Sequence, residues 1–187
     1  MKKYFTVVAA LVSLAAPVEA QRDSQLLDQQ AQAMTELDFL NGEWVGPAVA
    51  HELSGDITMM QTERSGTLLG GTIRLVEGRA FDTSGKTLFN AFAVVSYNPR
   101  TSQYVITSHA GGYVTSAELN LIATGFEWEV PAGPRAKMHF TATVKNGMWN
   151  ETGDYVAEGS DPRRTFEMNV RRLRPSDWPA GKPVKRH

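Results

Sequence analysis

Hydrophobic and polar positions follow two different rhythms along the chain, and the change comes at residues 41–44. Before it, apolar residues recur at helical spacing, which predicts a helix that runs from Ser24, as its N-cap, to Leu40. The pair Asn41-Gly42 ends this helix, because both residues tolerate positive φ. After it, short runs rich in β-branched and aromatic residues are separated by turn residues, which is typical of antiparallel strands.

The second part of the chain is predicted to form about ten strands joined mainly by hairpins. Asn146-Gly147 is the clearest turn, since this dipeptide is typical of two-residue hairpin loops. The connections are too short for crossover helices, which excludes a parallel sheet. The fold class is therefore all-β: an antiparallel up-and-down barrel with a short N-terminal helix. A β-sandwich is the alternative, but it leaves unpaired edges and usually needs longer connections. The predicted strands cover residues 43–51, 56–65, 68–81, 86–97, 102–110, 113–122, 125–131, 134–145, 147–157 and 164–173.

Alternation within the strands separates an inner from an outer face. In 134–145, Met138 and Phe140 share one face, and charged or polar residues share the other. The strand 86–97 is apolar on both faces. We therefore expect its outer face to be covered by the N-terminal helix or by the partner in a homodimer. A proline-rich stretch then predicts an extended C-terminal tail over 174–187.

Residues 1–20 have the three parts of a secretory signal peptide. Two lysines precede an apolar run from Tyr4 to Ala16, and small residues follow up to Ala20. The apolar run is too short to span a bilayer as a helix. We expect cleavage after Ala20 and a periplasmic or secreted protein, with a helical lead-in over 21–36 and one barrel domain over 37–173. A buried N-terminal helix is the alternative.

Charge and cysteine content narrow the functional classes. The chain has 19 basic and 20 acidic residues, a formal net charge of −1 and no cysteine. Such a balanced charge gives no electrostatic footprint for nucleic acid, and the basic residues near the C-terminus fit a solvated strand face and a charged tail. Without disulfides, an exported domain depends on buried apolar area for its stability.

The residues that could carry chemistry are few. No cysteine nucleophile is present, no serine lies in Gly-x-Ser-x-Gly, and the four histidines lack metal-ligand spacing. His109 precedes the Gly111-Gly112 turn and is the residue around which an enzyme site at the barrel mouth could form. The histidines are His51, His109, His139 and His187.

Glu151 is the carboxylate with the clearest alternatives. It shares a strand face with Trp149, and if that face is interior, Glu151 is buried and needs a partner, which Arg64 or Arg74 could supply. Glu167 lies one hairpin away and could form a carboxylate pair with it. The simpler interpretation is a structural ion pair or an exposed charge.

Several segments resemble known barrel families. A short helix that runs into Gly42-x-Trp44 resembles the start of calycin-superfamily barrels, which include lipocalins and fatty-acid-binding proteins. An ordered set of segments over 37–173 is similar to the bacterial family catalogued as domain of unknown function 1579. This resemblance implies a lipocalin-like barrel and no established activity, so it supplies no catalytic residues. The segments are Leu37–Gly46, Leu69–Thr72, Val94–Pro99, Gly147–Glu151 and Phe166–Arg172.

A neighbouring calycin-like group, the nitrobindin-type haem proteins, starts with Gly-x-Trp-x-Gly-x-Gly. It places its haem-ligating histidine near the C-terminal end of the barrel. Gly42, Trp44 and Gly46 match the opening pattern, but Ala48 stands in place of the last glycine and 164–173 holds no histidine. Both departures disfavour haem, and we predict neither a cofactor nor a metal.

Barrels of this size can hold one small ligand. We therefore predict an exported barrel protein that binds a small apolar or amphipathic molecule, and we assign it no catalytic residues. The main alternative is a cavity-less protein-interaction or envelope structural module; haem binding and a barrel-mouth enzyme rank below it. The predicted ligand-binding residues are an apolar lining of Trp44, Phe92, Met138, Phe140 and Trp149, with Arg64, Arg74 and Glu151 as polar anchors.

Overall fold

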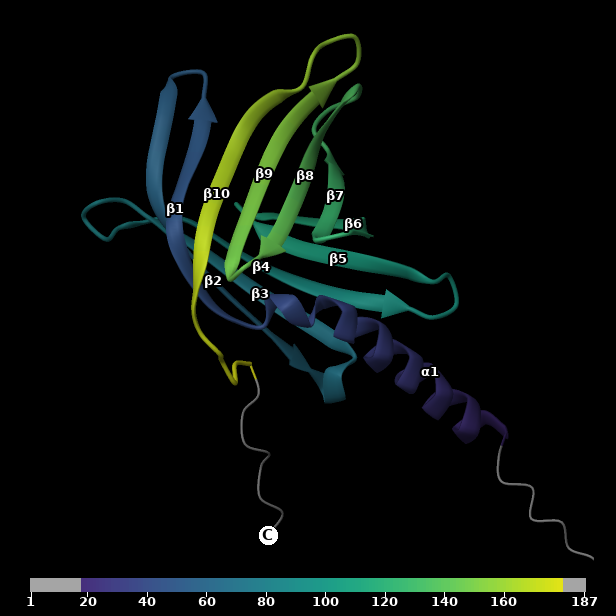
Figure 1. Cartoon of the computed structure of the whole chain (residues 1–187). Helices are drawn as coiled ribbons and strands as arrows, with labels where there is room; N and C mark the ends of the chain where they lie inside the picture. Colours follow the sequence, from purple (N-terminus) through teal and green to yellow (C-terminus); the bar gives the residue numbers. More distant parts are fainter. Residues whose placement is uncertain (1–17, 180–187) are drawn as a thin grey trace, which may run out of the picture.

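Ten antiparallel strands pair in sequence order, and the last strand pairs with the first to close the barrel (Figure 1). This arrangement, in a computed structural model that describes residues 18–179, confirms the predicted up-and-down barrel and excludes the sandwich. Strands β8, β9 and β10 cross β4 and β5 steeply in Figure 1. The strands are β1 Gly42–Glu52, β2 Gly55–Leu68, β3 Ile73–Phe81, β4 Thr87–Asn98, β5 Gln103–Ala110, β6 Tyr113–Ile122, β7 Gly125–Pro131, β8 Ala136–Lys145, β9 Met148–Ala157 and β10 Arg163–Arg174.

The N-terminal helix begins and ends earlier than predicted. Helix α1 spans Val18–Met34, so Ser24 lies inside it and is not its N-cap. The last stretch before the barrel is a separate 3-10 helix, η1, over Thr35–Leu40. No helix within residues 18–179 is long and apolar enough to cross a membrane. Residues 1–17 of the predicted signal peptide and 180–187 of the predicted tail lie outside the described residues.

The chain reverses between the second and third strands later than the sequence predicts. Strand β2 continues through Gly66 to Leu68, and the chain reverses in the short 3-10 helix η2 (Leu69–Gly71), where Gly70 has a φ of 69°. Gly66 is needed for a different reason. A Cβ at this position would lie 1.8 Å from the carbonyl oxygen of Trp178, because the C-terminal tail crosses the strand here.

One end of the barrel is closed by η1. Leu37 and Leu40 of this turn are fully buried, and the indole N–H of Trp44 donates to the carbonyl of Leu40 at 3.0 Å. The guanidinium of Arg172 lies over the Trp44 ring, 4.1 Å from its centroid. The same guanidinium donates to the backbone carbonyls of Phe39, at 2.6 Å, and Asn41. Arg172 therefore joins the last strand to the turn that fills the barrel end, and it does not belong to a solvated strand face.

A second arginine fixes this turn from β3. Arg74 is completely buried, and it donates to the carboxylate of Asp38 at 2.8 Å and the side-chain oxygen of Asn41 at 2.6 Å. Ser65 accepts a further bond at 3.2 Å. Burial lowers the pKa of Arg74, and the charge of Asp38 opposes this effect. The closed end is thus an ordered polar network beneath an apolar floor.

The outer face of β4 is covered in part by the C-terminal tail, which was not among the expected covers. The ring of Trp178 meets Phe92 edge to face, with centroids 6.5 Å apart, and the guanidinium of Arg64 lies 4.5 Å from the Trp178 ring centroid. Leu88 on the same face stays 43% exposed. The homodimer through this face remains a prediction.

Helix α1 packs at the end of the barrel, where it meets residues on the inner face of β4 and β5. Gln30 donates to the carbonyl of Tyr97 at 3.0 Å, and the hydroxyl of Tyr104 donates to the carbonyl of Ala33 at 2.7 Å. The two tyrosine rings lie 4.9 Å apart. The helix therefore seals the same end as η1.

We expect Arg172→Lys to destabilise the barrel, because lysine cannot stack on Trp44 and donate in a planar fork to two carbonyls. The free energy of unfolding, measured by urea titration, should fall by about 2 kcal/mol. The matched control is Arg171→Lys, since Arg171 is the exposed neighbour on the opposite strand face. It should stay within about 0.5 kcal/mol of the wild type. Equal effects of the two substitutions would contradict the role given to Arg172.

Candidate functional site

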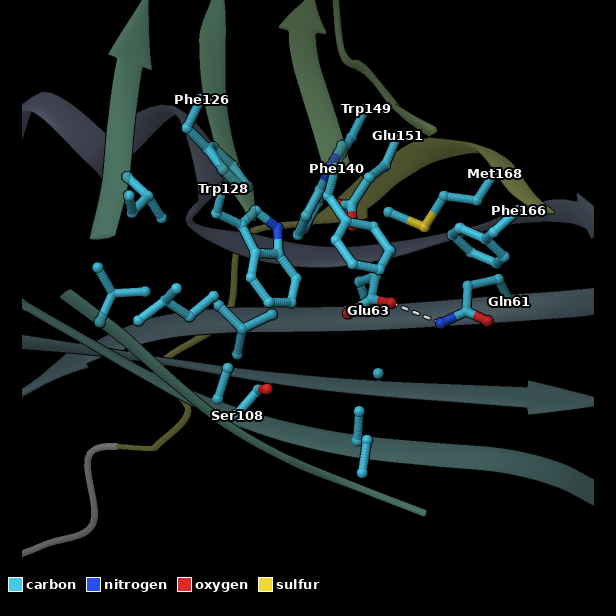
Figure 2. A pocket seen from close by; sticks show the side chains of 18 of the residues that line it. Gln61, Glu63, Ser108, Phe126, Trp128, Phe140, Trp149, Glu151, Phe166 and Met168 are labelled. Atoms are coloured by element: carbon cyan, nitrogen blue, oxygen red, sulfur yellow. Dashed lines mark hydrogen bonds between the residues drawn. The ribbon is translucent and has the colours of Figure 1, made fainter. Parts of the chain in front are cut away.

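The interior beyond η1 holds a cavity of about 500 Å³ (Figure 2). This volume is in the range of small-molecule binding sites. Leu37 and Leu40 contribute to its lining from the closed end, together with Trp149. Phe89 also lines the cavity and is 44% exposed, so the cavity reaches solvent at the opposite end.

Large and small side chains are distributed unevenly around this cavity. Strands β7–β10 contribute aromatic rings and methionines, and Trp128 stacks on Phe140 with centroids 4.5 Å apart. The facing strands β3–β5 contribute five residues with little or no side chain beside Val76, Phe89, Val95 and Ile106, so space is left opposite the rings. The volume stays open because the two sides do not interdigitate. The small residues are Gly78, Ala91, Ala93, Ser108 and Ala110.

Two carboxyl groups face this apolar space, and no basic side chain lines it within the described part of the chain. Glu63 comes from β2 and Glu151 from β9 (Figure 2). Gly78 on β3 makes room for the first of them, because a Cβ there would lie 2.6 Å from Glu63 Oε1. Gln61 donates to the same oxygen at 2.5 Å.

Both carboxyl groups hold their protons unusually tightly. Burial raises the pKa of Glu63 to about 8. The hydrogen bond from Gln61 lowers this pKa in part, and the charges of Glu151 and Glu77 raise it further. Burial likewise raises the pKa of Glu151 to about 7, and the indole N–H of Trp149 opposes the rise in part. Near neutral pH, the site therefore exchanges between carboxylic acid and carboxylate forms.

Two further polar atoms in this region lack a hydrogen-bond partner among the described residues. Gln61 is 2% exposed, and its Oε1 accepts no bond. Trp149 Nε1 is also buried and unpaired. It lies near enough to Glu151 to affect the pKa of that carboxyl, but the two do not meet in hydrogen-bond geometry. Buried polar atoms are seldom left in this state, so each is available to a ligand.

Half of the predicted ligand-binding residues line the cavity, and half do not. Trp44 and Arg74 face the interior but lie in the closed end, where they are fully buried against η1. Arg64 and Phe92 are on the outer face, where both contact Trp178. These four residues therefore lie outside the lining of the cavity. The four residues that do line the cavity are Met138, Phe140, Trp149 and Glu151.

The strand parity of β2 explains why Glu63 and Gln61 were missed. Both faces of this strand carry polar residues, so its sequence gives no apolar side to point inward. The prediction of Arg64 as a polar anchor requires the face of β2 that carries Arg64 to point into the barrel, and this face points outward. With Glu63 inside, Arg64 points outward and pairs with Glu77. Met59, Gln61 and Glu63 share one face of the strand at two-residue spacing, and Met59 is a weak signal that this face is the inner one.

The partners predicted for Glu151 are also corrected. Neither Arg64 nor Arg74 reaches it, and Glu167 lies on the outer face, 3.7 Å from Arg164 and 3.8 Å from His51. The carboxylate that acts on the same cavity is Glu63, which comes from a strand that does not neighbour β9. The pair is formed by closure of the barrel and not by a hairpin.

The described histidines do not contribute to the cavity. His51 pairs with Asp56 at 2.9 Å, and His139 pairs with Glu129 at 2.9 Å. His109 is exposed and points away from the lining, so it cannot serve an enzyme site inside the barrel mouth. Residues 18–179 contain no group of three or more potential metal ligands. The lining offers no imidazole, so it does not fit a haem held by histidine.

Comparison with known proteins supports the fold and goes no further. Neither the family models nor the curated proteins give a match to the chain. Among solved structures, the crystal structure of Rv2717c from M. tuberculosis is similar, with a TM-score of 0.60 and 12% sequence identity. The similarity covers 77% of this chain and 99% of that chain. Likeness at this identity shows a shared barrel fold alone.

We expect Glu63→Gln to change how stability depends on pH. A carboxyl whose pKa rises from 4.5 to about 8 on folding makes the folded state bind more protons than the unfolded state. The wild type therefore loses stability as the pH rises above 4.5, until Glu63 is ionised in both states. Glutamine removes this loss. The free energy of unfolding of the variant, relative to that of the wild type, should therefore rise by on the order of several kcal/mol from about pH 5 to about pH 9.

Urea unfolding of the wild type and of Glu63→Gln at about pH 5 and about pH 9 measures this difference in stability. Glu118→Gln is the control, because Glu118 is exposed on β6. The control should show the same pH dependence as the wild type. A parallel pH dependence of Glu63→Gln and the wild type would contradict the burial of an ionisable group at position 63.

Proposed function

We propose that the barrel binds a small apolar or amphipathic molecule in the cavity between η1 and the open end. The observation that supports this most strongly is the cavity of about 500 Å³, lined by aromatic, methionine and small aliphatic side chains. Apolar pockets with a few placed polar groups are the usual form of small-molecule sites. The same volume argues against the cavity-less interaction module.

The polar groups of the cavity would orient the ligand. Gln61, Glu63 and Glu151 all face a space that is otherwise nearly free of hydrogen-bonding groups. These acidic and amide groups take the place of the polar anchors predicted at Arg64 and Arg74, since Arg64 is outside the barrel and Arg74 is bound to Asp38 and Asn41 at its closed end. An amphipathic ligand would therefore present a hydrogen-bond donor to the protein.

Filling the cavity tests this proposal. Ala91→Phe places a ring among the small residues of β4, and we expect it to abolish binding of an environment-sensitive apolar dye that the wild type binds at about one per monomer. Dye fluorescence measures the binding, and thermal unfolding checks that the barrel is intact. Asn90→Phe is the control, since Asn90 is the exposed neighbour on the outer face. Dye that binds Ala91→Phe as tightly as the wild type would place the binding elsewhere.

We also propose that the protein is exported, as its N-terminal sequence pattern indicates. Mass spectrometry of the protein recovered from a periplasmic or culture fraction should give an N-terminus at Gln21. Recovery of the full chain, with Met1 intact, from the cytosol alone would contradict export. The ligand-binding proposal does not depend on this result.

A further inference from the structure

We propose that the ligand of the cavity is a cation: an amine or quaternary ammonium group attached to an apolar body, held by Glu63 and Glu151. This inference rests on the proposed binding function and names the chemical class of ligand for the same site. Its starting point is geometric. Two acidic side chains, from strands that β1 and β10 separate, face one apolar cavity, and none of the described residues that line it is basic.

The cationic side chains that residues 18–179 place near this region are engaged elsewhere. Arg64 and Arg79 both pair with Glu77 on the outer face. Arg74 pairs with Asp38 in the closed end, and Arg172 is held by carbonyls and Trp44. Buried carboxylates are normally paired with a cation or coordinate one, because an isolated ionised group in a low-dielectric space is very unfavourable. Residues 18–179 provide no such partner, so each group either keeps its proton or takes a cation from a ligand.

A second observation independent of the carboxyl groups points to the same chemistry. Gln61 directs its N–H donor to Glu63, which leaves its Oε1 as a buried acceptor without a donor. A protonated amine is a donor with no acceptor of its own, whereas a quaternary ammonium has no N–H and interacts through its charge alone. The site offers a protonated amine three acceptor groups, two carboxylates and one amide oxygen, and the unpaired donor Trp149 Nε1 lies beside the carboxyl of Glu151.

The aromatic wall fits the same ligand. Trp128, Phe140 and Trp149 lie around the cavity near the carboxyl groups, as Figure 2 shows. A cation held against aromatic faces is stabilised by their quadrupoles, and the effect is larger in desolvated sites. A carboxylate or phosphate ligand would meet the opposite conditions: like charge from Glu63 and Glu151 and no basic side chain.

Binding of a cation should be coupled to proton release. Glu63 and Glu151 are the titratable groups in the cavity, and the charged group that acts on Glu63 from the neighbouring strand is Glu77, itself paired with Arg64 and Arg79. An entering positive charge favours the carboxylate forms and displaces their protons. Affinity for a ligand of fixed charge should therefore rise with pH through the range in which these two groups ionise.

Three probes with one aromatic body separate charge from apolar contact. They are (naphthalen-2-ylmethyl)trimethylammonium, 2-naphthalenemethanol and 2-naphthylacetate, which are cationic, neutral and anionic. Isothermal titration calorimetry on the full folded protein at about pH 8 should show the cation binding roughly tenfold more tightly than the alcohol, and the anion more weakly than either. In Glu63→Gln and Glu151→Gln, the ratio of cation to alcohol affinity should fall toward one, while Glu118→Gln keeps the wild-type ratio.

Titrations in two buffers with different ionisation enthalpies provide an independent readout. Near pH 7, the cation should release protons into the buffer, and the alcohol should not. The cation should also bind more tightly at about pH 9 than at about pH 6. Thermal unfolding of both glutamine variants verifies that they fold; the neutral amide at either position is expected to keep the barrel intact because it removes a buried ionisable group.

The possible outcomes separate this inference from the proposed function. If none of the three probes or the apolar dye binds, the binding function itself fails. If the alcohol or the anion binds as tightly as the cation, the cavity binds ligands but does not select a cation. A cation affinity that is unchanged in both glutamine variants, or binding without proton release, would also overturn the inference. Tight cation binding that both variants weaken supports it.

Discussion

Pairing of the last strand with the first is the interaction on which the rest of the structure depends. The register of β1 and β10 sets Trp44 opposite Arg172, next to an irregularity in the ladder. This one cross-strand pair stacks the guanidinium on the indole, and both side chains then bond to the backbone of η1. The same two residues therefore link the first strand to the last and hold η1 in the end of the barrel. Without this link, Leu37 and Leu40 would have no fixed position and the cavity no floor.

Closure also determines which residues share the interior. Glu63 and Glu151 belong to strands that are not neighbours in the sheet, and only the curvature of a closed barrel directs both of them into one space. The same curvature sets the aromatic wall of β7–β10 opposite the small residues of β3–β5. Had both sides carried large side chains, the interior would be a packed core of the usual density. The cavity is thus a property of residue size on particular strands and not of the barrel fold in general.

Sequence patterns predicted most of the fold because they act locally. Turn pairs such as Asn146-Gly147 fixed the strand ends to within a few residues, and short hairpins left few topologies open. The candidate site was predicted less well where the outcome depends on parity or on distant contacts. In β8 the alternation is clear, and its apolar face with Met138 and Phe140 lies inside as predicted. In β2 both faces carry polar and apolar residues, so the pattern does not say which face is inside. The prediction put Arg64 inside, and the structure puts its neighbour Glu63 there.

Contacts across the chain were beyond local reasoning. Arg172 lies among other basic residues near the C-terminus, and nothing in its immediate sequence distinguishes it from the exposed Arg171. Only the position of Trp44 across the β1–β10 ladder gives it a buried role. The contacts of the C-terminal tail are also not predictable from local sequence. Trp178 follows the last strand, yet its ring packs against Phe92 and its backbone lies against Gly66, and both residues are distant in sequence. Helical or strand periodicity carries no information on such contacts.

The two buried carboxyl groups, Glu63 and Glu151, lower the stability of the folded protein above neutral pH. Leucine or glutamine at positions 63 and 151 would avoid the desolvation that raises both pKa values, and the barrel would be more stable above neutral pH. Gly78 adds to this, since its missing side chain makes room for a group that destabilises the fold. A fold usually retains such local costs where a site needs them. The role proposed for the two carboxyl groups is of this kind: in their ionised form they would repel an anion and carry a charge that a cationic ligand neutralises.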